Sequence, residues 1–449
     1  MNPSNLLNST FSLAILSRTA QQQQRSVHLT PMTTAATRST THTWAFRSRF
    51  RREAFGWKAS RLAIERIHDA LIEIRAVARH DPTTAAEGAV LLLEKLSPAL
   101  CHVDSSSGAL GGAAHTAVQE LAPLIGAAPV SDTVRQKWLD RLFEAMQNDD
   151  PPYIESLDDH WGELCATPEL AQHWIDQLLP TLKNVLHERQ RGTYAFYKGT
   201  SLCYSALFKV GRHDEILQLL SMDPHPIWPY LIWGARALVA QGEIDAAIAY
   251  LRERGGPHTS ATAIARFAED LLLQAGRRAE AFDQYALLAN QGNTHLGTFR
   301  AIAKKYPELA PEKLLAHLVA STPATPGKWF ATAKTLKLFD QAAQLAWASP
   351  CDPKTLTRAA RDHLSSHPAF AQSCALAALQ WIAQGHGYEL TIPDVRDAHR
   401  LALSAADATG EKDQAQATID QMLSTDRPSA AKVREILGLG PSKPGNPLP

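Results

Sequence analysis

The densest group of side chains that could do chemistry lies between residues 158 and 165. Two aspartates are followed by a histidine, a glutamate and a cysteine: Asp158, Asp159, His160, Glu163 and Cys165. On a helix His160 and Glu163 share a face because they are three residues apart, and Asp159 lies four residues before Glu163. If another helix completed the ligand set, Asp159, His160 and Glu163 would hold a divalent cation. The protein would then be a metal-dependent enzyme.

The alternative interpretation of this stretch is structural. Carboxylates are rarely fully buried, so the same residues also fit a solvated acidic face that turns Trp161 and Leu164 inward. The sequence contains no H-E-x-x-H pair, no paired-cysteine ligand motif, no Walker lysine loop and no dinucleotide glycine fingerprint. We therefore expect a non-enzymatic protein with no catalytic residues, no cofactor and no metal.

A second group is aromatic and lies between residues 194 and 233. Tyrosine and tryptophan on a concave surface are typical hot spots for a bound protein or peptide. At helical spacing the same residue types are equally typical of a core, so both interpretations stay open. The candidate partner-binding residues are Tyr194, Tyr197, Trp228, Tyr230 and Trp233.

A third group interleaves aromatic and basic residues from Trp44 to Arg61. Aromatic rings could stack on bases while arginines neutralise phosphates, which would make the protein a nucleic-acid-associated factor. Alternatively, the rings dock on the body of the protein and the arginines stay solvated or meet acidic helices. The whole chain is electrically neutral, with 45 Lys plus Arg and 45 Asp plus Glu, which argues against a general nucleic-acid coat. The nucleic-acid candidates are Arg47, Arg49, Arg51 and Arg52.

Helical hairpins are the elements that must position these groups. Gly211, Gly242 and Gly276 lie 31 and 34 residues apart, which is the period of a helix–turn–helix repeat. Glycine at the end of a first helix can adopt a positive φ without a side-chain penalty. Beyond Asn290 the period continues without its glycine until Gly410, with helix starts predicted at Pro311, Phe339 and Pro368.

The fold predicted from these patterns is all-α. No useful stretch alternates apolar and polar residues, so we expect no strand. A single hairpin cannot bury both apolar faces, so we expect neighbours to stack as an α-solenoid with a concave surface. The predicted organisation is a disordered N-terminal extension at 1–43, a helical region with the basic-aromatic arm at 44–190, a repeat region at 191–424, and a short helix with a disordered tail at 425–449.

Two resemblances accompany this prediction. The placement of Gly, Ala and Leu or Tyr in Gly242–Leu251 and Gly276–Tyr285 resembles the tetratricopeptide repeat, over roughly residues 196–424. That resemblance implies a superhelix of antiparallel hairpins. The chain from Trp44 to Ser424 also looks like a set of uncharacterised bacterial proteins, which implies a bacterial cytoplasmic protein. The stretches that carry this second likeness are AEGAVLLLEKLSPAL (86–100), VDSSSGA (103–109), HWGELC (160–165) and SPCDPKTLTRAARD (349–362).

The remaining features bear on location and function. Five scattered cysteines without a C-x-x-C pair fit free thiols in a reducing compartment, and no apolar run approaches the length of a membrane span. We expect a cytoplasmic scaffold that binds a protein or peptide on the concave face of its repeats. The alternatives are a nucleic-acid-associated factor that uses residues 44–61 and a metal-dependent enzyme with a site near residues 158–165.

Overall fold

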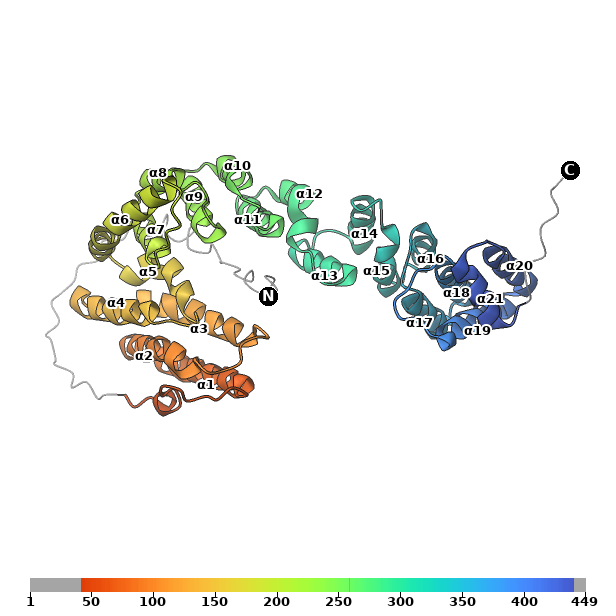
Figure 1. Cartoon of the computed structure of the whole chain (residues 1–449), viewed down its shortest axis with the longest axis horizontal. Coiled ribbons are helices and arrows are strands. Elements are labelled where there is room, and N and C mark those ends of the chain that lie inside the picture. The colour runs from red at the N-terminus through yellow and green to blue at the C-terminus, as the bar shows by residue number, and fades with distance from the viewer. Residues whose placement is uncertain (1–41, 258, 440–449) are drawn as a thin grey trace. The chain divides into compact units, whose positions relative to one another are not determined.

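The computed structural model describes residues 42–257 and 259–439 (Figure 1). Almost all of the predicted extension at 1–43, and residues 440–449 of the predicted tail, lie outside the described residues. Every regular element in the described residues is a helix and none is a strand, so the predicted all-α class is confirmed. No helix in this part of the chain is both long and apolar enough to cross a bilayer.

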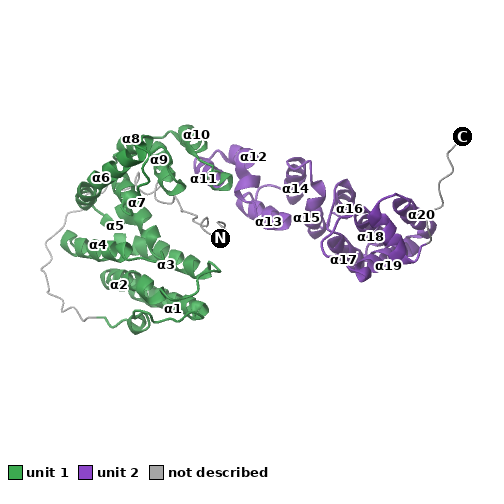
Figure 2. Cartoon of the chain, viewed as in Figure 1, with its two compact units in different colours: residues 1–264 green, residues 265–449 purple. Residues whose placement is uncertain are grey.

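The chain divides into two compact units, Met1–Ile264 and Ala265–Pro449 (Figure 2). The sequence instead suggested a boundary at residue 190. In the structure that position is the end of a helix inside unit 1, because one hydrophobic core runs without interruption from Trp44 to Ala237. A second core, in unit 2, extends from Ala286 to Val433.

Unit 1 begins with the arm and continues through paired helices. Side chains cap two of its helices: the Asp81 carboxylate accepts a hydrogen bond from the Thr84 amide at 2.9 Å, and the Thr167 hydroxyl accepts one from the Leu170 amide at 3.4 Å. The elements are η2 (Ala45–Ser48), α1 (Ser60–Ala78), α2 (Pro82–Leu100), α3 (Ala109–Gly126), α4 (Asp132–Gln147), η3 (Glu155–His160), α5 (Trp161–Cys165), α6 (Pro168–Gln190), α7 (Thr200–Lys209), α8 (His213–Met222), α9 (Trp228–Ala240) and α10 (Ile244–Arg254).

The division between the units falls inside α11 (Ala261–Gln274), and unit 2 contains the helices that follow. The predicted helix starts at Pro311, Phe339 and Pro368 are confirmed, as is a short helix after residue 425. The elements are α12 (Arg278–Ala289), α13 (His295–Lys305), α14 (Pro311–Ala320), η4 (Pro326–Trp329), α15 (Phe330–Thr335), α16 (Phe339–Ala348), α17 (Pro353–His363), α18 (Pro368–Ala383), α19 (Ile392–Thr409), α20 (Lys412–Leu423) and α21 (Pro428–Leu437).

The periodic glycines form the turns that the sequence predicted. Gly211, Gly242 and Gly276 have φ angles of 77°, 86° and 74° and separate α7 from α8, α9 from α10, and α11 from α12. Lys337 occupies the equivalent turn between α15 and α16 with φ 61°. The left-handed turn is therefore retained where the glycine signature disappears from the sequence.

Helices contact both their neighbours in the chain and the helices one position further on. In unit 1, α3 contacts α5, α5 contacts α7, and α7 contacts α9, while α6 contacts α8. Helix α7 is enclosed by this packing, and its buried side chains include the polar residues Thr200, Ser201 and Ser205 as well as apolar ones. The hydroxyls of Ser201 and Ser205 face the segment that carries Asp158 and Asp159.

Candidate functional site

The acidic group singled out in the sequence lies where η3 and α5 pack against α7. The Ser205 hydroxyl accepts a hydrogen bond from the Gly162 amide at 2.9 Å and donates one to the Asp159 carbonyl at 3.0 Å. A Cβ added at Gly162 would lie 2.3 Å from the Ser205 carbonyl oxygen, so only glycine allows this close approach. The segment that carries both aspartates is thus fixed directly against α7.

Asp159, His160 and Glu163, considered from the sequence as possible metal ligands, do not come together as one group. His160 Nδ1 lies 3.1 Å from Glu163 Oε2, as the three-residue spacing predicted. Asp159 does not join them, because residues 155–160 form a 3₁₀ helix rather than an α-helix and the four-residue spacing no longer selects one face. Within residues 42–257 and 259–439, no three His, Cys, Asp or Glu side chains are arranged to hold a metal.

The solvated-face interpretation is also only half correct. Trp161 and Leu164 are fully buried, as it requires. Asp158 and Asp159 are half-buried rather than solvated. Burial raises the pKa of Asp158 well above its usual range, and the neighbouring carboxylates of Asp159 and Glu155 raise it further, while the Ser201 hydroxyl acts in the opposite direction.

Asp159 has different neighbours. Burial raises its pKa too, but the charge of Arg236 on α9 opposes the shift, followed by His160 and the indole of Trp233. The Trp233 indole N–H lies near this carboxylate without making a hydrogen bond of standard geometry, and Asp159 Oδ1 is buried with no hydrogen-bond partner in the described residues. The guanidinium of Arg236 therefore acts on Asp159, and one oxygen of that carboxylate has hydrogen-bonding capacity left over.

The imidazole of His115, on α3, faces the same group. Burial lowers its pKa, as does the charge of His160, whereas Asp159 raises it. Its Nε2 lies 2.9 Å from Nε2 of the Gln119 side chain. We call Asp158, Asp159, His160, His115 and Arg236 the polar centre.

Two of the aromatic candidates form a wall of the polar centre. Tyr230 and Trp233 are only 5% and 3% exposed, so they belong to the core and not to an accessible surface as a partner-binding role would require. Burial raises the pKa of Tyr230, and the charge of Asp158 contributes. The Arg236 guanidinium lies 4.6 Å from the centre of the Trp233 ring. The acidic and aromatic groups of the sequence thus meet at one place.

The other aromatic candidates lie at the surface to different degrees. Tyr194 is 92% exposed, whereas Tyr197 and Trp228 are half-buried. Those three are accessible, and the two that face the polar centre are not.

The basic-aromatic arm divides its residues between core and solvent. Trp44, Phe46, Phe50 and Phe55 are buried, which matches the alternative in which the rings dock on the body of the protein. Their rings are therefore not free to stack on bases. The hypothesis that these four residues stack on nucleic-acid bases is wrong. Arg47, Arg49, Arg51 and Arg52 all stay exposed.

Unit 2 contains a pocket that sequence reasoning missed. It has a volume of about 410 Å³ and is bordered by α12, α13, α14 and η4. The ring of Phe282 lies 4.6 Å from that of His317, and the His295 ring lies 4.7 Å from that of Trp329. Single histidines and aromatics spread over residues 282–329 gave no motif to identify it.

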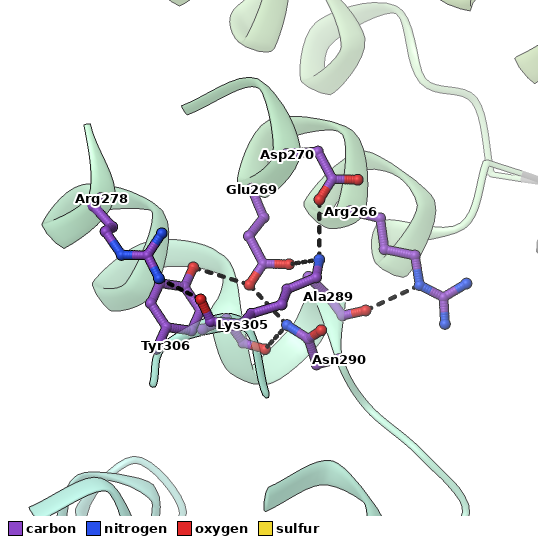
Figure 3. A network of polar contacts seen from close by, with 9 residues as sticks. Arg266, Glu269, Asp270, Arg278, Ala289, Asn290, Lys305 and Tyr306 are labelled. Carbon is purple, nitrogen blue, oxygen red and sulfur yellow. Dashed lines mark hydrogen bonds and ion pairs between the residues drawn. The ribbon is translucent and has the colours of Figure 1, made fainter. Parts of the chain in front are cut away.

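Unit 2 also contains a buried charge with a complete set of partners (Figure 3). Glu269 is 0% exposed, and its carboxylate accepts hydrogen bonds from the Lys305 ammonium at 2.6 Å, the Asn290 amide at 2.7 Å and the Tyr306 hydroxyl at 3.0 Å. Asp270 adds a second contact to Lys305 at 3.0 Å. The network joins α11, α12 and α13 and is expected to stabilise the packing of these helices.

Comparison with known proteins gives no family: no family model matches the chain, and no curated protein and no solved structure is significantly similar to it.

Proposed function

We propose that this protein is a non-enzymatic scaffold, built as an α-solenoid of tetratricopeptide-like hairpins, that binds a protein or peptide partner through a basic side chain. The basic group, a lysine ammonium or an arginine guanidinium, enters the polar centre of unit 1. It contacts the carboxyls of Asp158 and Asp159.

The contacts between helices support the solenoid. In unit 1, α3, α5, α7 and α9 each contact the next in one row, and α6 contacts α8 in the other. Glycine turns at regular intervals connect the rows. Stacked hairpins of this kind leave an extended face on which a partner can bind.

The single observation that carries the proposal is the convergence of Asp158 and Asp159 on one half-buried site. The two carboxyls repel each other when ionised, and Arg236 offsets only part of that repulsion. A second cation would form a charge-assisted hydrogen bond with Asp159 Oδ1, which has no hydrogen-bond partner in the described residues. Binding a cation therefore offsets the repulsion between the two carboxyls, whereas binding a neutral group would not.

The geometry favours an organic cation over a metal ion. The described residues bring no three metal-ligating side chains together, and the site is bordered by the rings of Tyr230 and Trp233. Carboxylates flanked by aromatic rings are the environment that proteins use for guanidinium and ammonium groups. No observation favours the metal-dependent enzyme considered for residues 158–165.

A peptide-display selection on the full chain tests the proposal. We expect the selected peptides to be rich in Lys or Arg and to bind Asp158→Asn/Asp159→Asn about tenfold or more weakly, because each charge-assisted hydrogen bond contributes about 1.5–3 kcal/mol. The matched control is Asp140→Asn/Asp176→Asn, which removes two exposed carboxylates from the same unit. Selected peptides without basic residues, or equal weakening by both double variants, would reject the proposal.

A further inference from the structure

The arginines of the arm surround a pocket of about 650 Å³ in unit 1. It lies between the turn after η2 and the first half of α1. Three of the four basic residues selected from the sequence line it, and Arg47 does not. Arg66 of α1 lines it instead, which the sequence could not indicate because it follows the arm by more than a helical turn. The four guanidinium groups belong to Arg49, Arg51, Arg52 and Arg66.

Acidic residues neutralise only part of this charge. One carboxylate oxygen of Asp69 lies 3.2 Å from Arg49 and 3.3 Å from Arg66, so a single carboxylate serves two guanidiniums. Glu53 lies 3.6 Å from Arg52, whose side chain is 85% exposed. Within the described residues Arg51 has no carboxylate in ion-pair range. The pocket therefore keeps a net positive charge.

The backbone that carries these arginines is held in place from several directions. The Glu73 carboxylate accepts hydrogen bonds from the amides of Ala45 at 2.7 Å and Phe46 at 3.2 Å. The Glu53 amide donates to the Pro98 carbonyl at 2.8 Å, and the rings of Phe50 and Phe55 are buried against the body. An arm fixed in this way loses little conformational freedom when a ligand binds, which favours affinity.

We propose that this pocket binds phosphate groups. Planar guanidiniums match the tetrahedral oxygens of phosphate through paired hydrogen bonds, and four of them converge here with only two carboxylates. The ligand is recognised by its phosphate and not by base stacking, because Phe46, Phe50 and Phe55 are buried. The exposed ring of the arm, Trp57, does not line the pocket.

Calorimetric titration of the full chain tests this inference, with inorganic phosphate, tripolyphosphate and a single-stranded oligonucleotide as three separate ligands at low salt. We expect saturable binding of at least one ligand, with an affinity that falls steeply as salt rises. Arg51→Gln/Arg52→Gln should lower that affinity by about tenfold or more, since two charge-assisted contacts are lost. Arg79→Gln/Arg191→Gln, which removes two exposed arginines elsewhere in unit 1, should leave it within about twofold.

The three ligands also distinguish the source of the phosphate. Binding of tripolyphosphate as tight as that of the oligonucleotide identifies a small-molecule phosphate as the ligand. Much tighter binding of the oligonucleotide identifies a nucleic-acid backbone. Absence of binding by all three ligands, or equal weakening by the two double variants, would overturn the inference.

Discussion

Both units place carboxylates away from bulk water, but the neighbours of these carboxylates differ. In unit 2, Glu269 is fully buried and receives an ammonium, an amide and a hydroxyl, so every strong interaction around it is favourable (Figure 3). In unit 1, Asp158 is half-buried beside two further carboxylates, and burial and like charge both raise its pKa. We therefore expect the first arrangement to stabilise its unit and the second to destabilise its own.

This difference separates a structural network from a candidate site. The Glu269 carboxylate already pairs with an ammonium and accepts three hydrogen bonds, so a further ligand would add little to it. Carboxyls that repel each other persist only where the surrounding fold holds them, and such positions are concentrated at binding sites. The polar centre, and not the Glu269 network, is therefore the candidate binding site.

The largest expected effect is the loss of the Glu269 network. Glu269→Ala leaves Lys305, Asn290 and Tyr306 without their shared acceptor and should destabilise α11–α13 by about 3 kcal/mol. Hydrogen exchange of the amides in these helices measures the free energy of opening. Glu280→Ala, which breaks a pair with Arg277 that is about a third exposed, should change it by less than about 1 kcal/mol. Equal changes in the free energy of opening for the two variants would show that the network does not stabilise these helices more than an exposed ion pair does.

Asp158→Asn should act in the opposite direction. Removing this carboxyl relieves the repulsion from Asp159 and Glu155, so unit 1 should become more stable at neutral pH, by about 0.5–2 kcal/mol, the usual range of a stabilising substitution. The measurement is hydrogen exchange in α5 and α7. A loss of stability would mean that Asp158 contributes to the fold as Glu269 does, and the contrast between the units would disappear.

The two clusters should also respond to different pH ranges. The folded pKa of Asp158 lies above its unfolded value of about 3.9, so the folded state holds the extra proton between these values. Stability of unit 1 should fall as pH rises through this interval, and Asp158→Asn should flatten the decline.

Burial lowers the pKa of Lys305 in unit 2, but its bonds to Glu269 and Asp270 raise that pKa by more. Its stabilisation should be complete below about pH 10.4 and be lost as pH rises through the higher folded value.

Hydrogen exchange in each unit measures both pH ranges of stability loss. It is recorded across pH in the native chain and in Asp158→Asn. A flat profile for unit 1 in the mildly acidic range would contradict the assignment of a raised pKa to Asp158.

The smallest effect is expected at Asp159. Asp159→Asn removes repulsion toward Asp158 but also the attraction to Arg236 and His160, so the two contributions largely cancel. We expect a change in the free energy of unfolding within about 0.5 kcal/mol. Chemical denaturation of the single variants beside Asp158→Asn/Asp159→Asn measures this, and a double-mutant coupling near zero would show that the two carboxyls do not interact.

Local features of the fold were predictable from the sequence, and contacts between distant segments were not. Gly211, Gly242 and Gly276 mark turns because few other residues adopt a positive φ without strain. Lys337 adopts the same conformation, so the turn it forms gives no sequence signal. Glu269 occupies an amphipathic helix, where an acidic residue indicates solvent, and only the packing of α13 against α11 and α12 brings Lys305 and Tyr306 to it.

The candidate site was predictable in its parts and not in its assembly. The residues of η3 and of α9 were both singled out, from residue type and density. Their meeting depends on how helices distant in the sequence pack together, and His115 and Arg236 join for the same reason. This packing involves side chains spread from residue 115 to residue 236, which no local spacing encodes.

The central claim is that the polar centre receives a basic side chain, and proton release on binding tests it most directly. A cation beside Asp158 lowers the pKa of that carboxyl, so binding expels its proton. Calorimetry of a selected basic peptide, in two buffers of different ionisation enthalpy at mildly acidic pH, measures the protons released. We predict release on binding to the native chain and less release with Asp158→Asn, in which Asp159 alone keeps a raised pKa. A binding heat independent of buffer, with unchanged affinity for Asp158→Asn, would contradict the account.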